Sequence, residues 1–545
     1  MKKPLAIGID SFRRIREDDY YYIDKTLMIQ DFLEFRQKVA LITRPRRFGK
    51  TLNMTMLREF FDITKDSKDI FAGLRIMDTE YKSQINSMPV IFLTLKNCSG
   101  NTHEEIKESL AETIREEYMR YVEIFGKAVD KESPRYIMFY RTYEALLAGE
   151  ISESLLKNSL SELIKAVSLY YGRTVLVLID EYDQPLIKAH EKCFRSEFTN
   201  VYGGFLGKAL KGNEYLGQAL LTGIQRVAKE SIFSELNNFL VYTVLSKKYS
   251  PYFGLTTEET RQALQDYGEE LSEEIRSYYD GYMFGEINMY NPWSILCYLN
   301  EHELRPYWIN TSTNALVREL IPKASRDFLT AFEELILDGE VEVAVNLEAS
   351  FLEMANTGTL WGLLINAGYL TGIRSIGAGE LILRIPNNEV KSEFRSIVAS
   401  YLQLGGDELN QLFNALQANN MERFLNLYQK LIYRYVSVHD IKENGYHMLF
   451  LGMAISVSGM YRITSNQEAG DGRPDIVMES LQPIIRPHVV FEFKQGENVE
   501  KLKQQALEQI LEKKYYANLT GKVLCVGLAH SQKKCELVYE KIEVE

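Results

Sequence analysis

The sequence is poor in the features that mark secreted, zinc-binding or membrane-spanning proteins. Its five cysteines are scattered without a CxxC pair, which argues against a zinc site and against a disulfide framework. No apolar run approaches the length of a membrane span, and no apolar signal-peptide core follows the start at Met1. We therefore expect a protein of the reducing cytoplasm, without membrane contact.

An excess of positive charge is also missing. Among 545 residues, 63 Lys and Arg are outnumbered by 75 Asp and Glu, so the net charge is -12. No global positive field draws such a chain to nucleic acid, and any contact must come from a local patch. The hydrophobic content of 46% and the length suit two to four domains, each with its own core.

No repeat, low-complexity tract or Pro/Gly/Ser-rich linker divides the chain, so changes of pattern must indicate its domains. In the first half, short apolar runs alternate with amphipathic stretches, which is typical of a parallel sheet covered by helices. The expected strands are residues 39–43, 90–95, 174–179 and 215–221. We expect an α/β domain at 1–245, a helical lid at 246–346, a helical connecting region at 347–437 and a second α/β domain at 438–545.

A candidate phosphate-binding loop follows the first expected strand. The segment from Arg44 to Thr51 reads RPRRFGKT and opens an amphipathic helix. This order of strand, loop and helix surrounds a phosphate with backbone N–H groups and the helix dipole. Lys50 would reach the β- and γ-phosphates of ATP, and Thr51 would ligate Mg²⁺. The expected nucleotide-binding residues of the loop are Arg46, Arg47, Gly49, Lys50 and Thr51.

The loop departs from the Walker A pattern at its first position, where Arg44 replaces glycine. A residue with a side chain restricts the first turn, so weak nucleotide binding and a simple basic turn that caps a helix are alternatives. The apolar strand at 174–179, followed by Asp180 and Glu181, favours the nucleotide site. Asp180 would bind Mg²⁺ and Glu181 would orient the attacking water. Arg226 is a candidate γ-phosphate sensor, with a surface arginine as the alternative.

The C-terminal region carries a candidate metal site. Asp475 precedes an apolar segment, and Glu492 and Lys494 follow after a gap suited to a hairpin. Side chains alternate along a strand, so Glu492 and Lys494 share one face while Phe491 and Phe493 bury the other. Two carboxylates beside a lysine are suited to hold Mg²⁺ or Mn²⁺ and to activate water against a phosphodiester. An edge strand of alternating charge has the same pattern.

Several segments together carry a family resemblance. They are YIDKT at 22–26, RPRRFGKT at 44–51, IDEYDQP at 179–185, LTG through NN at 221–238, YNPW at 290–293 and YW at 307–308. The chain resembles bacterial and archaeal AAA-ATPase-like proteins that carry a C-terminal PD-(D/E)XK nuclease domain. In that family arginine typically replaces the first Walker A glycine, so Arg44 is a family trait. The resemblance also implies that Asp24 and Lys25 lie near the nucleotide.

The resemblance extends to the helices around the candidate metal site. The family has an acid followed by Tyr-His, which matches Glu443, Tyr446 and His447. Glu443 is a candidate third metal ligand, with a solvated helix acid as the equal alternative, and His447 is expected to pack or form hydrogen bonds. Nucleases of this class often place a glutamine on the helix after the ExK strand, as Gln505 and Gln509 stand here.

The implied fold is α/β: an AAA/STAND-like P-loop sheet with a helical lid, then a restriction-endonuclease-like domain. One function that fits is an ATP-binding, ATP-regulated, metal-dependent nuclease acting on nucleic acid, with DNA favoured. The alternative is a nucleotide switch whose nuclease-like domain binds a partner without cutting, which the acidic net charge and the lack of a basic stripe favour. The sequence leaves a homo-oligomer open.

Overall fold

The chain folds as two units, one of residues 1–312 and 339–390 and the other of residues 313–338 and 391–545. The structure, a computed structural model, describes residues 2–192, 194–225, 239–308, 325, 327–328, 331–332, 334–335, 339–347, 357–377, 379–391, 406–435, 446, 450, 453–454, 457, 459–465, 470 and 472–544.

The first unit is built on a five-stranded sheet in which every neighbouring pair is parallel. Its strands, in the order β2-β3-β4-β1-β5, are β2 (Val90–Thr94), β3 (Val175–Asp180), β4 (Leu216–Gly223), β1 (Val39–Thr43) and β5 (Phe239–Tyr242). The four strands expected from the sequence are confirmed to within two residues at each end. Because β1, β4 and β3 are parallel, the phosphate loop after β1 and the acidic end of β3 lie at the same edge of the sheet, on either side of β4.

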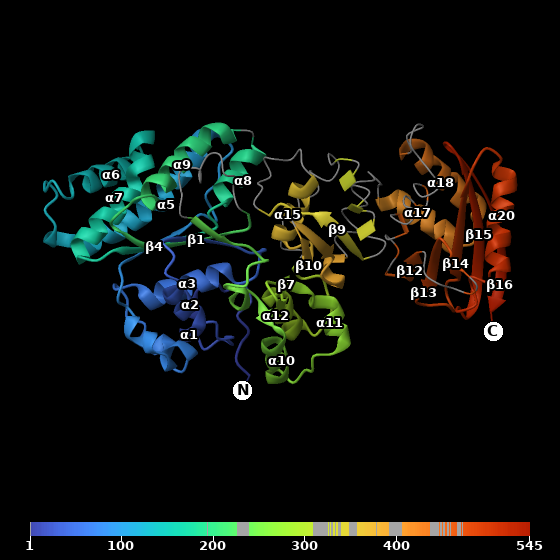
Figure 1. Ribbon diagram of the computed structural model, residues 1–545, viewed down its shortest axis with the longest axis horizontal. Coiled ribbons are helices and arrows are strands. Elements are labelled where there is room, and N and C mark those ends of the chain that lie inside the picture. The colour runs from blue at the N-terminus through green and yellow to red at the C-terminus, as the bar shows by residue number, and fades with distance from the viewer. Residues whose placement is uncertain are drawn as a thin grey trace. The chain divides into compact units, whose positions relative to one another are not determined.

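Helices cover both faces of this sheet (Figure 1). Successive strand residues point to opposite faces, so Leu41 joins one apolar core and Ile42 joins the other. On the Ile42 side lie α1 (Phe12–Glu17), α2 (Leu27–Phe35), α3 (Lys50–Phe61) and α4 (Lys68–Phe71). On the Leu41 side lie α5 (His103–Phe125), α6 (Ile137–Ala148), α7 (Glu153–Tyr171), α8 (Gln184–Glu191) and α9 (Arg195–Leu210).

The rest of the first unit contains two small antiparallel sheets as well as helices. The first sheet comprises β6 (Leu255–Thr256), β8 (Ile287–Tyr290) and β7 (Tyr282–Phe284), accompanied by α10 (Thr257–Asp266), α11 (Glu273–Tyr279) and α12 (Pro292–Glu301). The second comprises β10 (Thr371–Gly377), β11 (Glu380–Arg384) and β9 (Glu340–Ala344), accompanied by α15 (Thr357–Ala367).

The regions 246–346 and 347–437, expected as a helical lid and a helical connecting region, thus contain these short strands as well as helices. Most of them have only two to five residues, too few for a period of two to stand out against neighbouring helices. The strands β9 and β11 pair across the expected boundary at residue 346, so chain on both sides of it shares one sheet.

The second unit has a mixed five-stranded sheet in sequential order. Its strands are β12 (Tyr461–Ser465), β13 (Ile476–Ser480), β14 (His488–Gln495), β15 (Gly521–Ser531) and β16 (Lys534–Val544). Only β14 and β15 pair in parallel, and α20 (Val499–Glu512) connects them. A side chain at Gly527 would collide with the carbonyl oxygen of Lys503, so glycine lets α20 pack closely on β15.

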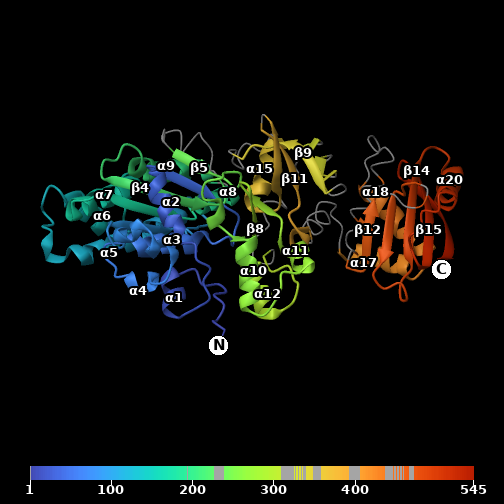
Figure 2. The same cartoon turned by 60° about the horizontal axis from the view of Figure 1, so that its bottom comes forward.

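Two helices upstream cover the other face of this sheet. Phe491 and Phe493 pack with the apolar residues of α17 (Gly406–Gln417) and α18 (Met421–Tyr435), whereas Val490 packs toward α20. Figure 2 shows these three helices beside the C-terminal sheet. The expected connecting region at 347–437 therefore differs from the structure, because α17 and α18 complete the core of the C-terminal sheet.

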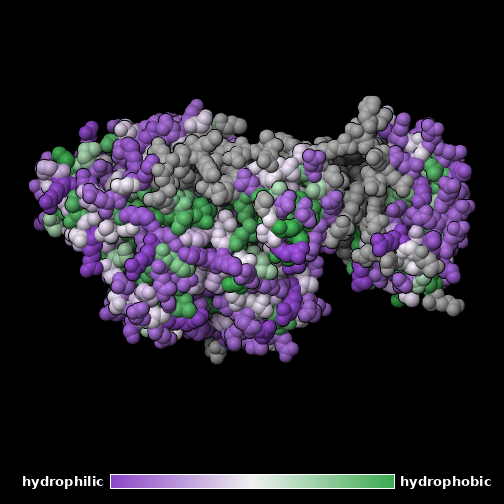
Figure 3. All heavy atoms as spheres, in the orientation of Figure 1, coloured by the Kyte–Doolittle hydropathy of each residue, from purple (hydrophilic) through white to green (hydrophobic). Residues whose placement is uncertain are grey.

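Within the described ranges, every helix is too short or too polar to span a bilayer. Figure 3 shows that hydrophilic residues predominate on the visible face of the C-terminal unit.

Candidate nucleotide and metal sites

The loop between β1 and α3 has the backbone shape of a phosphate cradle. Arg47 and Gly49 both adopt left-handed conformations, with φ of 66° and 82°. The Lys50 ammonium turns back and donates to the carbonyl oxygens of Arg44 at 3.0 Å and of Pro45 at 2.8 Å. Burial lowers the pKa of Lys50, although Glu181 and Asp180 act in the opposite direction. A buried cation held mainly by carbonyl dipoles suits an anionic ligand.

The acidic end of β3 lies directly beside this loop. Asp180 accepts a hydrogen bond from the Thr51 hydroxyl at 2.6 Å and one from the Thr222 hydroxyl at 2.5 Å. Glu181 follows in a left-handed conformation with φ of 52°, and burial raises its pKa while Lys50 opposes the shift. The structure thus brings together Lys50, Thr51, Asp180 and Glu181, as the sequence predicted, and adds Thr222.

Arg44, which stands in place of the Walker A glycine, points away from the phosphate cradle. Its guanidinium donates to the carbonyl oxygens of Thr43 at 2.8 Å and Tyr242 at 3.0 Å. It lies 5.4 Å from the ring centre of Phe253 and 5.3 Å from that of Phe284. Burial lowers the pKa of Arg44 to about 9. Arg44 therefore supports the loop from behind and leaves its phosphate-facing side clear.

A cavity of about 420 Å³ adjoins the loop. Its wall combines the loop with the N-terminal segment and α12, and includes Ile9, Tyr22, Lys25, Glu181, Trp293 and Leu296. This volume lies within the range of small-molecule sites. Lys25, which the resemblance placed here, lines the cavity and donates to Glu259 at 2.5 Å. Asp24 instead accepts from the backbone N–H groups of Thr26 and Arg75, both at 2.8 Å, and so orders the adjoining turn.

Asp183 is a site residue that sequence reasoning missed. Its side chain is buried and accepts from the backbone N–H groups of Ile224 at 2.8 Å and Gln225 at 2.9 Å. It therefore ties the loop after β4 to the loop after β3. The IDEYDQP segment contained this acid, but nothing local indicated its partners 41 and 42 residues away. The predicted sensor Arg226 lies outside the described residues.

The C-terminal acids converge at the end of β14. The Lys494 ammonium donates to Glu492 at 3.2 Å. Asp475 accepts from the backbone N–H of Phe493 at 2.6 Å, and Glu492 accepts from the backbone N–H of Asp475 at 3.4 Å. These reciprocal bonds place both carboxylates and the lysine at one edge of the sheet, as their spacing predicted.

A glutamine from α20 completes the described part of this cluster. Gln509 donates both to Glu492 and to the hydroxyl of Tyr515, the latter at 3.0 Å. Gln505 is exposed, so Gln509 is the member of the predicted pair that reaches the acids. Tyr515 follows α20, and sequence reasoning missed it.

Glu492 is an acid of the cluster whose pKa is shifted by its surroundings. Burial and the neighbouring Asp475 raise the pKa of Glu492 to about 7, and Lys494 only partly offsets them. Its side chain is 4% exposed. Two carboxylates with one lysine fit a Mg²⁺ ion that takes further ligands from water and phosphate. The described residues form no cluster of three or more metal-ligating acids, His or Cys, and the candidate third acid Glu443 and its neighbour His447 lie outside them.

Fold and sites together define two classes of domain. A parallel sheet with a phosphate loop beside an acidic strand end is the architecture of P-loop nucleotide-binding domains. A mixed sheet that presents an acid and an ExK strand toward one helix is that of PD-(D/E)XK nuclease domains, as the resemblance implied.

Comparison with known proteins agrees with both assignments. Residues 6–233 match the family of predicted AAA-ATPases, and residues 441–540 match the PD-(D/E)XK nuclease superfamily. The chain is 28% identical over 542 residues to a protein of Azotobacter chroococcum mcd 1 described as an uncharacterized protein in the vnfD 5′ region, and the match covers 94% of this chain and 93% of that protein. The chain joins an AAA-ATPase-like domain to a PD-(D/E)XK nuclease-like domain.

Proposed function

We propose that this chain is an ATP-regulated, metal-dependent nuclease that hydrolyses phosphodiester bonds of nucleic acid in the cytoplasm, with DNA as the favoured substrate. The observation that carries the proposal is the cluster of Asp475, Glu492 and Lys494 with Gln509. Two acids lie beside one lysine, and burial together with Asp475 raises the pKa of Glu492, which Lys494 only partly offsets. A divalent cation would supply further positive charge.

At the nucleotide site, each side chain has a distinct task. Lys50 would exchange its carbonyl partners for the β- and γ-phosphates, and Thr51 and Asp180 would hold Mg²⁺, which would neutralise charge on the phosphates. Glu181 would orient the water that attacks the γ-phosphate. Arg46 and Arg47 add positive charge at the loop's outer edge, where both are accessible from the cavity.

At the cleavage site, Asp475 and Glu492 would hold Mg²⁺ or Mn²⁺, which would supply Lewis acidity at the scissile phosphate. Lys494 lies beside Glu492, where its ammonium orients the attacking water and stabilises developing negative charge. Gln509 fixes the Glu492 carboxylate through a direct hydrogen bond and is itself bonded to Tyr515. Glu443 is the proposed third acid.

The test is cleavage by the purified full chain. Labelled duplex DNA, single-stranded DNA and RNA are incubated with and without Mg²⁺ or Mn²⁺, and with and without ATP. We expect metal-dependent cleavage of DNA that ATP alters, and its loss in Lys494→Ala. Cleavage that persists at the same rate in Lys494→Ala reveals a contaminating nuclease and contradicts the proposal.

The second candidate function is a nucleotide switch with a non-cleaving nuclease-like domain. The net charge of -12 favours it, because an acidic chain repels nucleic acid beyond any local patch. Wild type that binds ATP yet cuts no substrate under any of these conditions would support this function in place of the first.

A further inference from the structure

Two tryptophans contact two of the three arginines of the phosphate loop, Arg46 and Arg47. The Arg47 guanidinium lies 4.1 Å from the ring centre of Trp293, a stacking distance. The indole N–H of Trp308 donates to the carbonyl oxygen of Arg46 at 3.0 Å. Neighbouring residues of one loop are therefore attached to indoles that lie 15 residues apart in the chain, at the start of α12 and after its end.

A buried glutamate joins the segments that carry these tryptophans. Glu389 accepts from the backbone N–H of Trp308 at 2.7 Å. It also accepts from the hydroxyl of Ser294, which follows Trp293, at 2.8 and 3.0 Å. Glu389 is fully buried, and burial of a carboxylate is tolerated only when hydrogen bonds replace its water. Its position therefore fixes both tryptophan-bearing segments relative to each other.

We expect Arg47 to be the residue of this arrangement that changes its contacts when a ligand binds. It is exposed, lines the cavity, and holds a left-handed backbone conformation that residues with a side chain rarely adopt. Such a conformation persists when surrounding contacts hold it. A planar guanidinium bonds a phosphate through two charged hydrogen bonds, which are stronger than its contact with a partly exposed indole. A phosphate bound in the loop would therefore draw the Arg47 guanidinium away from the Trp293 ring.

We propose that Trp293 and Trp308, joined by Glu389, form a clamp on the phosphate loop, and that a nucleoside triphosphate draws Arg47 off Trp293. This proposal rests on the proposed nucleotide site and adds a positioning residue, Glu389, that does not touch the nucleotide. When Arg47 leaves the ring of Trp293, the loop loses its contact with the start of α12. Nucleotide binding at the loop would thereby affect the region of the β6-β8-β7 sheet.

The experiment follows tryptophan emission of the full chain during titration with ATP and Mg²⁺, with calorimetry in parallel. The sequence has three tryptophans, so each can be removed in turn. We expect wild-type emission to change with occupancy, and Trp293→Phe to lose that change at ATP concentrations that calorimetry shows to saturate the variant. Trp361→Phe is the matched control, because Trp361 is buried in α15 outside the clamp, and its response should equal that of wild type.

Substitution of the arginine and the glutamate tests the contacts themselves. Arg47→Ala should alter Trp293 emission already without nucleotide, and should weaken ATP binding about tenfold, the usual effect of one lost charged hydrogen bond. Glu389→Gln retains an acceptor for Trp308 and should keep the response. Glu389→Ala should lose the emission response, even in samples that circular dichroism shows to be folded. Loss of a residue that only stabilises the fold would not have this effect.

The outcomes distinguish a failure of this proposal from a failure of the proposed nucleotide site. Wild type that produces no ATP binding heat overturns the nucleotide site and the exchange of Arg47 together. Binding heat without any change in Trp293 emission overturns the exchange alone. Unchanged emission of nucleotide-free Arg47→Ala overturns the stacked contact, and a full response in folded Glu389→Ala overturns the role of Glu389.

Discussion

The candidate nucleotide site and the candidate metal site of this chain contain buried groups of opposite charge. In the first, a buried ammonium, that of Lys50, is satisfied by the carbonyl oxygens of Arg44 and Pro45, and burial lowers its pKa. In the second, the buried carboxylate of Glu492 has Asp475 as a neighbour, and burial raises its pKa to about 7. Burial penalises the charge in both sites.

The comparison shows what each site lacks. The first site would gain from an anion beside its lysine, and the second from a cation between its acids. Partner groups also differ: neutral dipoles hold Lys50, whereas an amide and an ammonium hold Glu492. If the first site binds phosphate and the second binds a metal ion, substitutions should affect the binding of these two ligands separately.

The largest effect is expected at the metal site. Asp475→Ala removes one of two described carboxylates, so metal binding and cleavage should fall together, cleavage by roughly a thousandfold. Lys494→Ala should reduce cleavage about a hundredfold and leave metal affinity within a few-fold, since the ammonium acts on water and developing charge. Metal titration and cleavage rates measure both. A Lys494→Ala protein that loses its metal would show that the lysine only pairs with Glu492.

The next effect concerns the nucleotide site. Lys50→Ala removes the ammonium expected to meet the phosphates and should weaken ATP binding by about a hundredfold or more. Calorimetry measures it, and Lys82→Ala, on the exposed surface of the same unit, controls for the loss of one charge. Equal affinities for Lys50→Ala and wild type would show that the loop does not bind ATP.

A stability measurement tests how much the burial of Glu492 lowers the free energy of unfolding. The pKa of Glu492 is about 7 in the folded protein, against 4.5 for an ordinary glutamate. Glu492 therefore lowers the stability of the metal-free protein as pH rises from 4.5 through 7, and costs most above 7. Glu492→Gln should stabilise the second unit by on the order of 2 kcal/mol at pH 8 and little at pH 4.5. Urea unfolding in EDTA measures it, and an equal difference at both pH values contradicts the assignment.

Metal affinity should follow the same titration. Below pH 7 the Glu492 carboxyl carries a proton that the metal must displace, so affinity should fall about tenfold for each pH unit. Above about pH 8 it should level off, because the carboxylate is then already ionised. A calorimetric Mn²⁺ titration from pH 5.5 to 8.5 gives the slope. A flat profile below pH 7 would mean that Glu492 is not a ligand.

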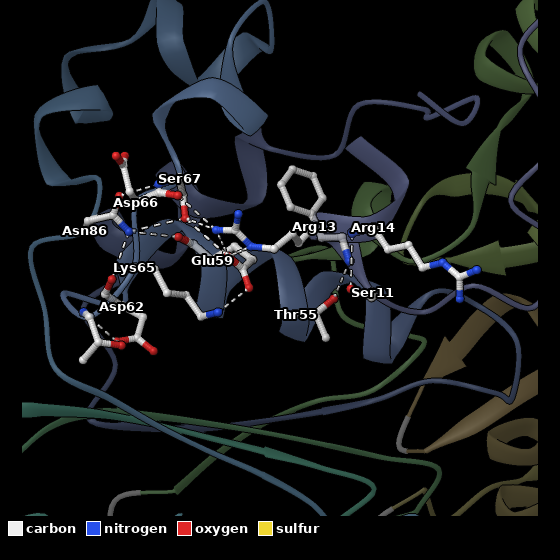
Figure 4. Close-up of polar contacts among 12 residues, drawn as sticks. Ser11, Arg13, Arg14, Thr55, Glu59, Asp62, Lys65, Asp66, Ser67 and Asn86 are labelled. Atoms are coloured by element: carbon white, nitrogen blue, oxygen red, sulfur yellow. Dashed lines mark hydrogen bonds and ion pairs between the residues drawn. The ribbon is translucent and has the colours of Figure 1, made fainter. Parts of the chain in front are cut away.

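The smallest effect is expected in an ion-pair cluster between α1 and the later part of α3 (Figure 4). Arg13 on α1 bonds Glu59 on α3 at 2.7 and 2.9 Å, and Lys65 bonds it at 2.8 Å. Burial would raise the pKa of Glu59, but the bonds from Lys65 and Arg13 outweigh it and lower the pKa. Arg13→Ala should cost only about 1 kcal/mol, because Lys65 remains.

A matched control lies next to Arg13. Arg14 pairs with Asp18, and both side chains are more than half exposed, so Arg14→Ala should leave stability nearly unchanged. Thermal unfolding at pH 7 and below pH 4 measures both. The Arg13→Ala deficit should disappear at the lower pH as Glu59 is protonated. Equal deficits for the two variants would show that burial of Glu59 adds nothing to the pair.

The amino-acid sequence by itself determined the strands of the first sheet, the phosphate loop and the order of the C-terminal acids. These features depend on local patterns, such as the alternation around Glu492 and the strand before Arg44, and close neighbours in the chain specify them. The tertiary structure alone decided which distant groups meet. Glu389 bonds Ser294 and Trp308 across 95 and 81 residues, and α17 and α18 pack on the C-terminal sheet. No local period encodes such contacts, because they form only when the sheets and helices pack.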